Sequence, residues 1–286
     1  MLRAPGVGSA RGASTVGTAA EIDNRNHALG SDSFIVRSMH PRALVLAVLV
    51  ALLGLAPAGA ARAATNGSMV AFGDSVPSGA YCRCTPFPVL YARKVASRTR
   101  RPVRMSNDAV SGATSASVLR QVEQGSARAA IRASGTVLLM IGANDFTPAF
   151  RQVLRHERRG VPAYRPVARR VRANLTATIR EIQALHPGVR VLVADYWNVV
   201  RDGRVGRSHY GAWGMRKAEQ ATYWANHAIR AAAADRRVRV VSTYVGFKGV
   251  HGHRDPTWLL ASDGDHPNAR GHVEIADQFY AAAPTG

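Results

Sequence analysis

The sequence predicts an α/β fold, in which a parallel β-sheet is covered by helices on both faces. Short apolar runs alternate with longer segments whose apolar residues recur at helical spacing, which is typical of such sheets. The run at residues 136–141 is apolar throughout, as expected for a strand buried on both faces. Polar residues follow several of the runs, and ligands bind at the carboxyl ends of the strands in these folds.

Each strand and helix is predicted from this pattern. The apolar runs predict strands at residues 68–72, 103–106, 136–141, 189–194 and 237–241. Helical spacing predicts helices at residues 86–98, 115–123, 127–133, 167–185, 214–234 and 268–283. The chain shows no internal repeat, and its length after the leader fits one domain with a sizeable core.

A leader precedes the predicted fold. Residues 1–38 are rich in glycine, alanine and serine, so we interpret them as a non-native or disordered extension and Met39 as the true start. Residues 39–63 have a basic start, an apolar run and an Ala-x-Ala ending, the pattern of a secretory signal peptide. The apolar run is shorter than the about 20 residues of a membrane-spanning helix. We therefore expect a secreted or envelope-associated protein with a single domain at residues 64–286, and an uncleaved anchor is the alternative.

The chain is strongly basic, with 38 Lys and Arg residues against 18 acidic residues and a net charge of +20. Such a charge favours association with nucleic acid or with an anionic cell envelope. The basic residues are mostly arginines spread along the chain, without blocks or interleaved aromatic residues, so we expect no nucleic-acid partner. A solvated surface explains most of this charge, and electrostatic association with the envelope is the functional interpretation. We expect a monomer.

Two cysteines and two histidines raise the question of a metal site. Cys82 and Cys84 are one residue apart; export permits a disulfide between them, although the ring that it closes is tight. Zinc requires more ligands than this pair offers. His251 and His253 have only Asp255 nearby. We therefore expect a local disulfide that shapes the loop after the first strand, surface histidines, and neither a metal nor an organic cofactor.

A candidate nucleophile follows the first predicted strand, where Gly-Asp-Ser at residues 73–75 places Ser75 on a turn. A serine hydroxyl needs exposure and a base to act as a nucleophile. Asp263 and His266 lie three residues apart in the loop after the last strand, and an aspartate at this spacing can accept the Nδ1–H of the imidazole and leave Nε2 free. We expect Asp74 to tie the turn and Asp265 to be a solvated bystander. Alone, each motif is also compatible with an ordinary turn.

Two further residues are candidate donors to a developing oxyanion. Asn144 directly follows the strand at 136–141, and a side-chain amide there can donate a hydrogen bond to negative charge. Gly112 lies in the loop after the second strand, and a glycine lets its backbone N–H approach a substrate closely. With the N–H of Ser75, these groups supply three donors.

Taken together, these motifs resemble those of the SGNH hydrolases, the GDSL esterase and lipase superfamily, in a secreted bacterial form. The resemblance is carried in order by residues 73–79, by Gly112, by Gly-x-Asn-Asp at 142–145 and by Asp-x-x-His at 263–266. It implies a three-layer α/β/α sandwich with a flavodoxin-like five-stranded parallel sheet and no cofactor.

The resemblance also assigns roles to the site residues. Ser75 is the expected nucleophile, His266 its base and Asp263 the acid that orients the base. The N–H groups of Ser75 and Gly112 and the amide of Asn144 form the expected oxyanion hole. The implied activity is hydrolysis of carboxylic esters through an acyl-serine intermediate. Because no lid segment is apparent, we expect short to medium acyl chains.

Other activities remain open from the sequence. One alternative is an O-deacetylase or acyltransferase that acts on a carbohydrate or cell-envelope ester, and another is a non-catalytic envelope-binding protein. A small-molecule, lipid or glycan ester is the expected partner in the catalytic cases. Several aromatic residues fall near the loops that form the site and are candidates either for an acyl pocket or for the core. They are Tyr81, Phe87, Phe146, Tyr196, Trp197 and Trp258.

Overall fold

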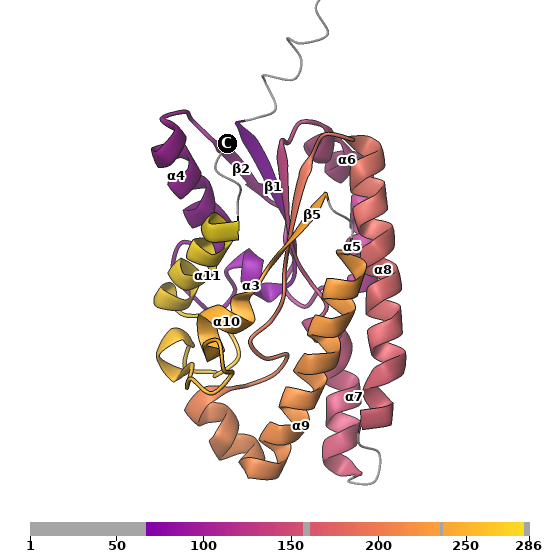
Figure 1. The fold of residues 1–286 in the computed structure, drawn as a ribbon, viewed down its shortest axis with the longest axis vertical. Helices are drawn as coiled ribbons and strands as arrows, with labels where there is room; N and C mark the ends of the chain where they lie inside the picture. Colours follow the sequence, from indigo (N-terminus) through magenta and orange to yellow (C-terminus); the bar gives the residue numbers. More distant parts are fainter. Residues whose placement is uncertain (1–66, 157–160, 235–236, 283–286) are drawn as a thin grey trace, which may run out of the picture. The chain divides into compact units, whose positions relative to one another are not determined.

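A parallel five-stranded sheet forms the centre of the protein in the computed structural model, which describes residues 67–156, 161–234 and 237–282 (Figure 1). The strands are β1 (Ser68–Gly73), β2 (Arg104–Asn107), β3 (Thr136–Met140), β4 (Arg190–Ala194) and β5 (Val238–Val241). Their order is β2-β1-β3-β4-β5 and every neighbouring pair is parallel. The predicted α/β class and flavodoxin-like strand order are confirmed.

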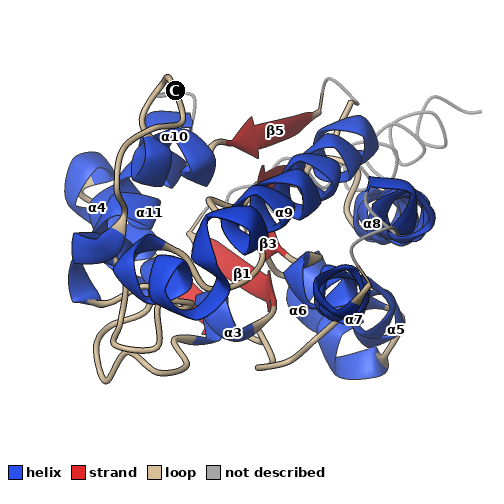
Figure 2. Ribbon diagram, turned by 90° about the horizontal axis from the view of Figure 1, so that it is seen from below, coloured by secondary structure: helices blue, strands red, loops and turns tan. Residues whose placement is uncertain are grey.

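Helices cover both faces of the sheet (Figures 1 and 2). One face carries α4 (Phe87–Thr99), α10 (Thr243–Lys248) and α11 (Ala269–Ala282). The other carries α5 (Ser115–Val122), α6 (Gly125–Arg132), α7 (Ala143–Arg155), α8 (Tyr164–Leu185) and α9 (Gly203–Ala232). The short helix α3 (Ser75–Ser78) follows β1, and single 3-10 turns lie at Val161–Ala163 and Thr257–Leu259. The expected three-layer sandwich is therefore confirmed.

The two central strands position the polar segments that follow them. Phe72 of β1 pairs with Leu139 of β3, and Gly73 pairs with Met140, so both strands end side by side. Strand β2 pairs with the other edge of β1, which makes the β1–β3 boundary the point where the chain changes its winding direction. Ligands bind outside the carboxyl ends of strands at such a switch point.

Four helical segments differ from the sequence prediction. Helices α3, α7 and α10 were not predicted, and α9 begins at Gly203 rather than at residue 214. Pro148 lies inside α7, and proline is normally a helix-breaking signal. Gly211 interrupts α9 with a φ of 63°, so its first half shows no continuous helical pattern. The other predicted elements are present, with ends that shift by a few residues.

The described residues all belong to one compact unit, Pro57–Gly286. The predicted extension at 1–38 and the predicted leader at 39–63 lie outside the described residues. Among the helices that the structure describes, none is both long and apolar enough to cross a membrane.

Candidate active site

Ser75 is the first residue of α3, at the point where β1 ends. The turn before it is tight, because a Cβ at Gly73 would lie 2.1 Å from the carbonyl oxygen of Met140. The Asp74 N–H donates to the same carbonyl at 3.2 Å. The Asp74 carboxylate caps α3 by accepting the N–H of Val76 at 3.0 Å. These contacts direct Ser75 to the carboxyl edge of the sheet.

Asp74 is buried and ties this turn to the end of β4, as the sequence predicted for a structural residue. Its side chain is 1% exposed and also accepts a hydrogen bond from the Tyr196 hydroxyl. Burial raises the pKa of Asp74 to about 6, although the bonds from Tyr196 and Val76 act in the opposite direction. Burial and the Asp74 charge together hold the pKa of Tyr196 well above its usual value.

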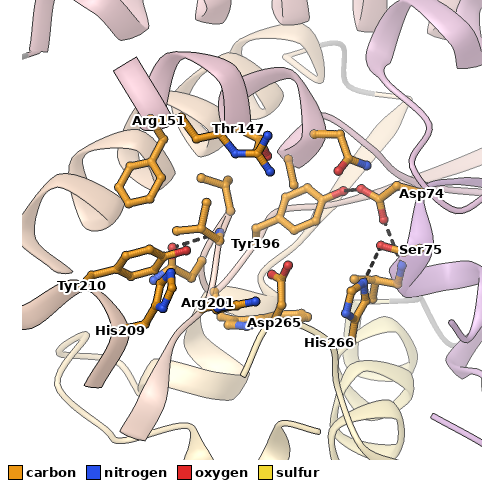
Figure 3. A pocket seen from close by; sticks show the side chains of 18 of the residues that line it. Asp74, Ser75, Thr147, Arg151, Tyr196, Arg201, His209, Tyr210, Asp265 and His266 are labelled. Atoms are coloured by element: carbon orange, nitrogen blue, oxygen red, sulfur yellow. Dashed lines mark hydrogen bonds between the residues drawn. The ribbon is translucent and has the colours of Figure 1, made fainter. Parts of the chain in front are cut away.

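Ser75, His266 and Asp263 form a continuous chain of hydrogen bonds, part of which is drawn in Figure 3. His266 Nε2 lies 2.9 Å from Ser75 Oγ, and His266 Nδ1 lies 2.6 Å from Asp263 Oδ2. The side chains of His266 and Asp263 are 12% and 26% exposed. The structure therefore brings together the three residues that the sequence singled out from two distant segments, in a geometry that permits proton transfer.

The loop that carries His266 is held in shape by the carboxylate of Asp263, which lies in the same loop. Asp263 Oδ1 accepts the N–H groups of Asp265 and His266 at 3.0 and 3.1 Å. Gly264 turns the loop with a φ of 69°, and a Cβ there would lie 2.5 Å from Val205. Partial burial raises the pKa of Asp263, but the bonds from Asp265 and His266 outweigh it and lower the pKa below its usual value. Asp263 therefore stays charged beside the imidazole.

Tyr81 packs against one face of the His266 imidazole. Its ring stacks on that of His266 with 4.3 Å between centroids. The next residue, Cys82, forms a disulfide with Cys84, and their Cα atoms are 5.0 Å apart. The structure thus contains the local disulfide that the sequence predicted, and it lies next to the residue that contacts His266.

Asn144 lies in the first turn of α7 and lines the same cavity as Ser75. Its amide donates to the carbonyl of Ala113 at 2.9 Å, which leaves its second N–H available. The neighbouring Asp145 accepts the N–H and hydroxyl of Ser115 at 2.8 and 2.7 Å, so α7 and α5 are joined at this point. Gly112, with a φ of 80°, precedes Ala113 but is exposed and lies outside the residues that line the cavity.

Ser75, His266 and Asn144 line a cavity of about 360 Å³ (Figure 3). Much of its wall comes from segments that the sequence analysis did not single out. Helix α7 contributes Thr147, Phe150, Arg151 and Leu154, the segment after β4 contributes residues 196–201, and α9 contributes His209 and Tyr210. Apart from the aromatic candidates Tyr196 and Trp197, these residues carry no recognisable motif. The unpredicted helix α7, the segment after β4 and the first half of α9 bring them to the site.

The prediction that Asp265 is a solvated bystander is wrong. The side chain is only partly exposed and lines the cavity beside His266. Burial raises the pKa of Asp265, and the nearby Asp263 charge adds to this effect, whereas His266 and Arg201 oppose it. The sequence places Asp265 in the loop beside His266. The cavity that Asp265 lines is formed by residues far away in the sequence, so its burial could not be predicted from the loop alone.

The aromatic candidates divide among four environments. Tyr196 and Trp197 line the cavity, and Tyr81 contacts His266. Phe87 and Phe146 are buried in the core, and Trp258 is 50% exposed. Only part of this set thus belongs to the site.

One group of potential metal ligands occurs among the described residues, formed by Cys82, Cys84 and His272. The two sulfur atoms are bonded to each other. His272 Nδ1 accepts the N–H of Phe87 at 3.2 Å, which places the ring proton on Nε2. The group as it stands therefore offers no thiolate and no free imidazole lone pair for a metal.

The fold and the placement of a serine at the end of β1 define the class of protein. A five-stranded parallel sheet in this order, flanked by helices, is the fold of the SGNH hydrolases. The chain belongs to the GDSL-like Lipase/Acylhydrolase family, which matches residues 71–273. It is accordingly a carboxylic ester hydrolase.

Several solved structures share this fold. A lipase from a goat rumen metagenome is 18% identical, with a TM-score of 0.61 over 76% of this chain and 97% of that chain. Phospholipase A1 from Streptomyces albidoflavus NA297 is 22% identical, with a TM-score of 0.52 over 76% and 100% of the two chains. An acetyl xylan esterase is 15% identical, with a TM-score of 0.53 over 76% and 99%. No curated protein matches the chain in sequence.

Proposed function

We propose that the protein is a secreted serine esterase in which Ser75 attacks the ester carbonyl. The observation that carries this proposal is the hydrogen-bonded chain from Ser75 Oγ through His266 to Asp263, with distances of 2.9 and 2.6 Å. In this mechanism His266 Nε2 takes the hydroxyl proton as the carbonyl is attacked. Asp263 holds the imidazole in the required tautomer and stabilises its positive charge.

The remaining steps use the same groups. Negative charge develops on the carbonyl oxygen and is stabilised by the backbone N–H of Ser75 and by the amide of Asn144, which both line the cavity. The backbone N–H of Gly112, outside this lining, is the third donor in the proposal. His266 then protonates the leaving alcohol, and an acyl ester forms on Ser75 Oγ. A water molecule that gives its proton to His266 hydrolyses this ester, which releases the acid and restores the serine.

A short to medium acyl chain is the substrate that we propose. The cavity has a volume of about 360 Å³, and Phe150, Leu154 and Val199 are among the apolar residues that line it. Export belongs to the same proposal, on the strength of the leader pattern at residues 39–63. Amino-terminal sequencing of the native protein from culture medium should begin after residue 63, and a retained leader would contradict export.

The first prediction concerns the nucleophile. Ser75→Ala should abolish hydrolysis of p-nitrophenyl butyrate and labelling by a fluorophosphonate, because no other group is placed to form the acyl ester. Ser126→Ala, on the exposed surface of α6, is the matched control and should retain both. Circular dichroism checks that the variants fold. Wild-type activity in the Ser75→Ala protein would refute the mechanism.

A second candidate function is removal or transfer of an acyl group on a polar alcohol, such as a carbohydrate. The observation that favours it is the set of polar side chains that line the cavity, among them Asn198, Arg201 and Asp265. Release of acetate from acetylated polysaccharide distinguishes this substrate from simple esters. Product analysis with an added alcohol acceptor distinguishes transfer from hydrolysis.

A further inference from the structure

The end of the cavity away from Ser75 is basic. Arg151, Arg201 and His209 line it together with the hydroxyl-bearing Tyr210. Figure 3 shows His209 and Tyr210 on the opposite side of the cavity from Ser75, with Arg201 between. These side chains come from α7, from the segment after β4 and from α9, so their approach is a product of the fold.

Arg201 and Arg151 both influence the ionisation of the Tyr210 hydroxyl. The Arg201 backbone N–H hydrogen-bonds to the Tyr210 hydroxyl. Burial and the negative charge of Asp265 raise the pKa of Tyr210, while the positive charges of Arg201 and Arg151 oppose the rise. A charge influences a titrating group strongly only at close range. Arg151, Arg201 and Tyr210 line the same cavity, so both positive charges act on the Tyr210 hydroxyl across it.

The charges of these arginines are not neutralised by a direct ion pair. Other arginines are paired, as in Arg207–Asp255 and Arg230–Asp195, both at 2.6 Å. In the part of the chain that the structure describes, no carboxylate forms a salt bridge with Arg151 or Arg201. Asp265 lines the same cavity and interacts electrostatically with Arg201 without forming a salt bridge. Two guanidinium groups that face a cavity without a salt bridge can still bind an anion.

We propose that this cavity end is a subsite for an anionic group of the ester substrate, a carboxylate or a phosphate, held by Arg151 and Arg201. Guanidinium groups bind both anions through paired N–H donors. Phe150 and Leu154 line the same cavity and provide an apolar surface for the part of the substrate between the reacting carbonyl and the anion. The inference rests on the proposed role of Ser75 and names the class of ester that reaches it.

The test compares esters that differ only in charge. In one arm, p-nitrophenyl hydrogen glutarate is compared with p-nitrophenyl pentanoate, so that the anion lies in the acyl part. In the other, acetyl glycerophosphate is compared with monoacetyl glycerol, so that the anion lies in the alcohol part. In one of the arms the wild type should have a kcat/KM for the charged ester at least about tenfold above that for the neutral ester, the size expected for one charge-assisted hydrogen bond.

The arginine variants test the assignment. Arg151→Met and Arg201→Met should each lower the charged-to-neutral ratio of kcat/KM about tenfold, mainly through KM. Arg155→Met is the matched control, because Arg155 is exposed in the last turn of α7 and does not line the cavity. The control should keep the wild-type ratio. A wild type without preference in both arms, or a preference that survives both arginine substitutions, would overturn the subsite.

Binding separates this inference from the proposed function. Calorimetry with Ser75→Ala measures the affinity for the same charged and neutral esters without turnover. Adding Arg151→Met or Arg201→Met to this protein should remove the preference for the charged ester, and equal affinities before the second substitution would refute the subsite. Failure of the wild type to hydrolyse any of the esters would instead contradict the proposed function, while the binding result still decides the subsite.

Discussion

Three aspartates close to Ser75 and His266 differ because their surroundings differ. Asp263 accepts several hydrogen bonds, and its pKa is lowered despite partial burial, so it remains a carboxylate that can orient His266. Burial raises the pKa of Asp74 to about 6. The Asp74 carboxylate accepts hydrogen bonds from Val76 and Tyr196, so its role is structural. Burial also raises the pKa of Asp265, which faces the cavity. The role of each residue follows from its environment rather than from its type.

At the same scale, Asn144 is expected to act mainly in the transition state. Its amide is oriented by the bond to the Ala113 carbonyl, and its free N–H can stabilise an oxyanion. Asn144→Ala should lower kcat by about 100-fold with a much smaller change in KM. Steady-state kinetics with p-nitrophenyl butyrate measures both constants. A rise in KM at unchanged kcat would assign Asn144 to substrate binding instead.

The loop between α3 and α4 connects a disulfide to the imidazole. Tyr81 and Arg83, on either side of Cys82, have positive φ values of 64° and 31°, an uncommon backbone for residues other than glycine. The bridge to Cys84 holds the chain in this local shape, and it presents the Tyr81 ring to His266 although Tyr81 itself is 72% exposed. The loop thus provides a face against which the imidazole is positioned.

Opening this loop should lower kcat. Tyr81→Ala or reduction of the disulfide should each reduce kcat by about two- to tenfold, while KM changes little. This is the effect expected from the free energy of one stacked ring pair. Tyr81→Phe keeps the ring and should retain the wild-type kcat.

A double-mutant comparison separates positioning from general loosening of the fold. If Tyr81 transmits the effect of the bridge, reduction should cause no further loss in Tyr81→Ala. Fully additive losses would show that the disulfide acts independently of Tyr81. The Cys82→Ser protein serves as a reference that cannot be reduced.

On the scale of the whole molecule, a buried histidine joins α11 to the start of α4. His272 is 0% exposed and accepts the N–H of Phe87. Burial, with a smaller effect of His266, lowers the pKa of His272 from its usual value of 6.5 to about 4. The native state therefore resists protonation that the unfolded chain accepts.

This difference predicts a loss of stability in acid. As the pH falls from 6.5 towards 4, the unfolded state binds the proton first, so His272 removes about 3 kcal/mol of unfolding free energy. The raised pKa of Asp74 has the opposite effect in an overlapping pH range, because the native state binds this proton first and its unfolding free energy rises as the pH falls. Chemical denaturation of wild type and His272→Gln at several pH values isolates the histidine, because Asp74 is common to both.

The expected result is a wild-type unfolding free energy that falls by about 3 kcal/mol relative to His272→Gln between pH 7 and pH 4. Glutamine is polar and does not titrate over this pH range, so the variant serves as the reference for all other titrating groups. Parallel stability curves would show that His272 is not the titrating group.

Much of the fold could be predicted from local pattern, and the exceptions have physical causes. The buried strand β3 is a continuous apolar run, and the helix α8 is amphipathic over most of its length, so each shows its period directly. Helix α7 contains Pro148, and α9 is interrupted at Gly211. Both are stabilised by packing on neighbouring helices, which local propensity does not reveal.

By itself, the sequence determined the parallel α/β architecture and identified Ser75, Asn144 and the Asp263–His266 pair, because apolar period and short motif spacing are local properties. Only the tertiary structure decided that Tyr81 stacks on His266 and that Asp265 faces the cavity. The basic cavity end was decided in the same way, since its residues lie on separate elements. Contacts between such distant segments depend on how the helices pack against the sheet, and short-range spacing carries no record of that packing.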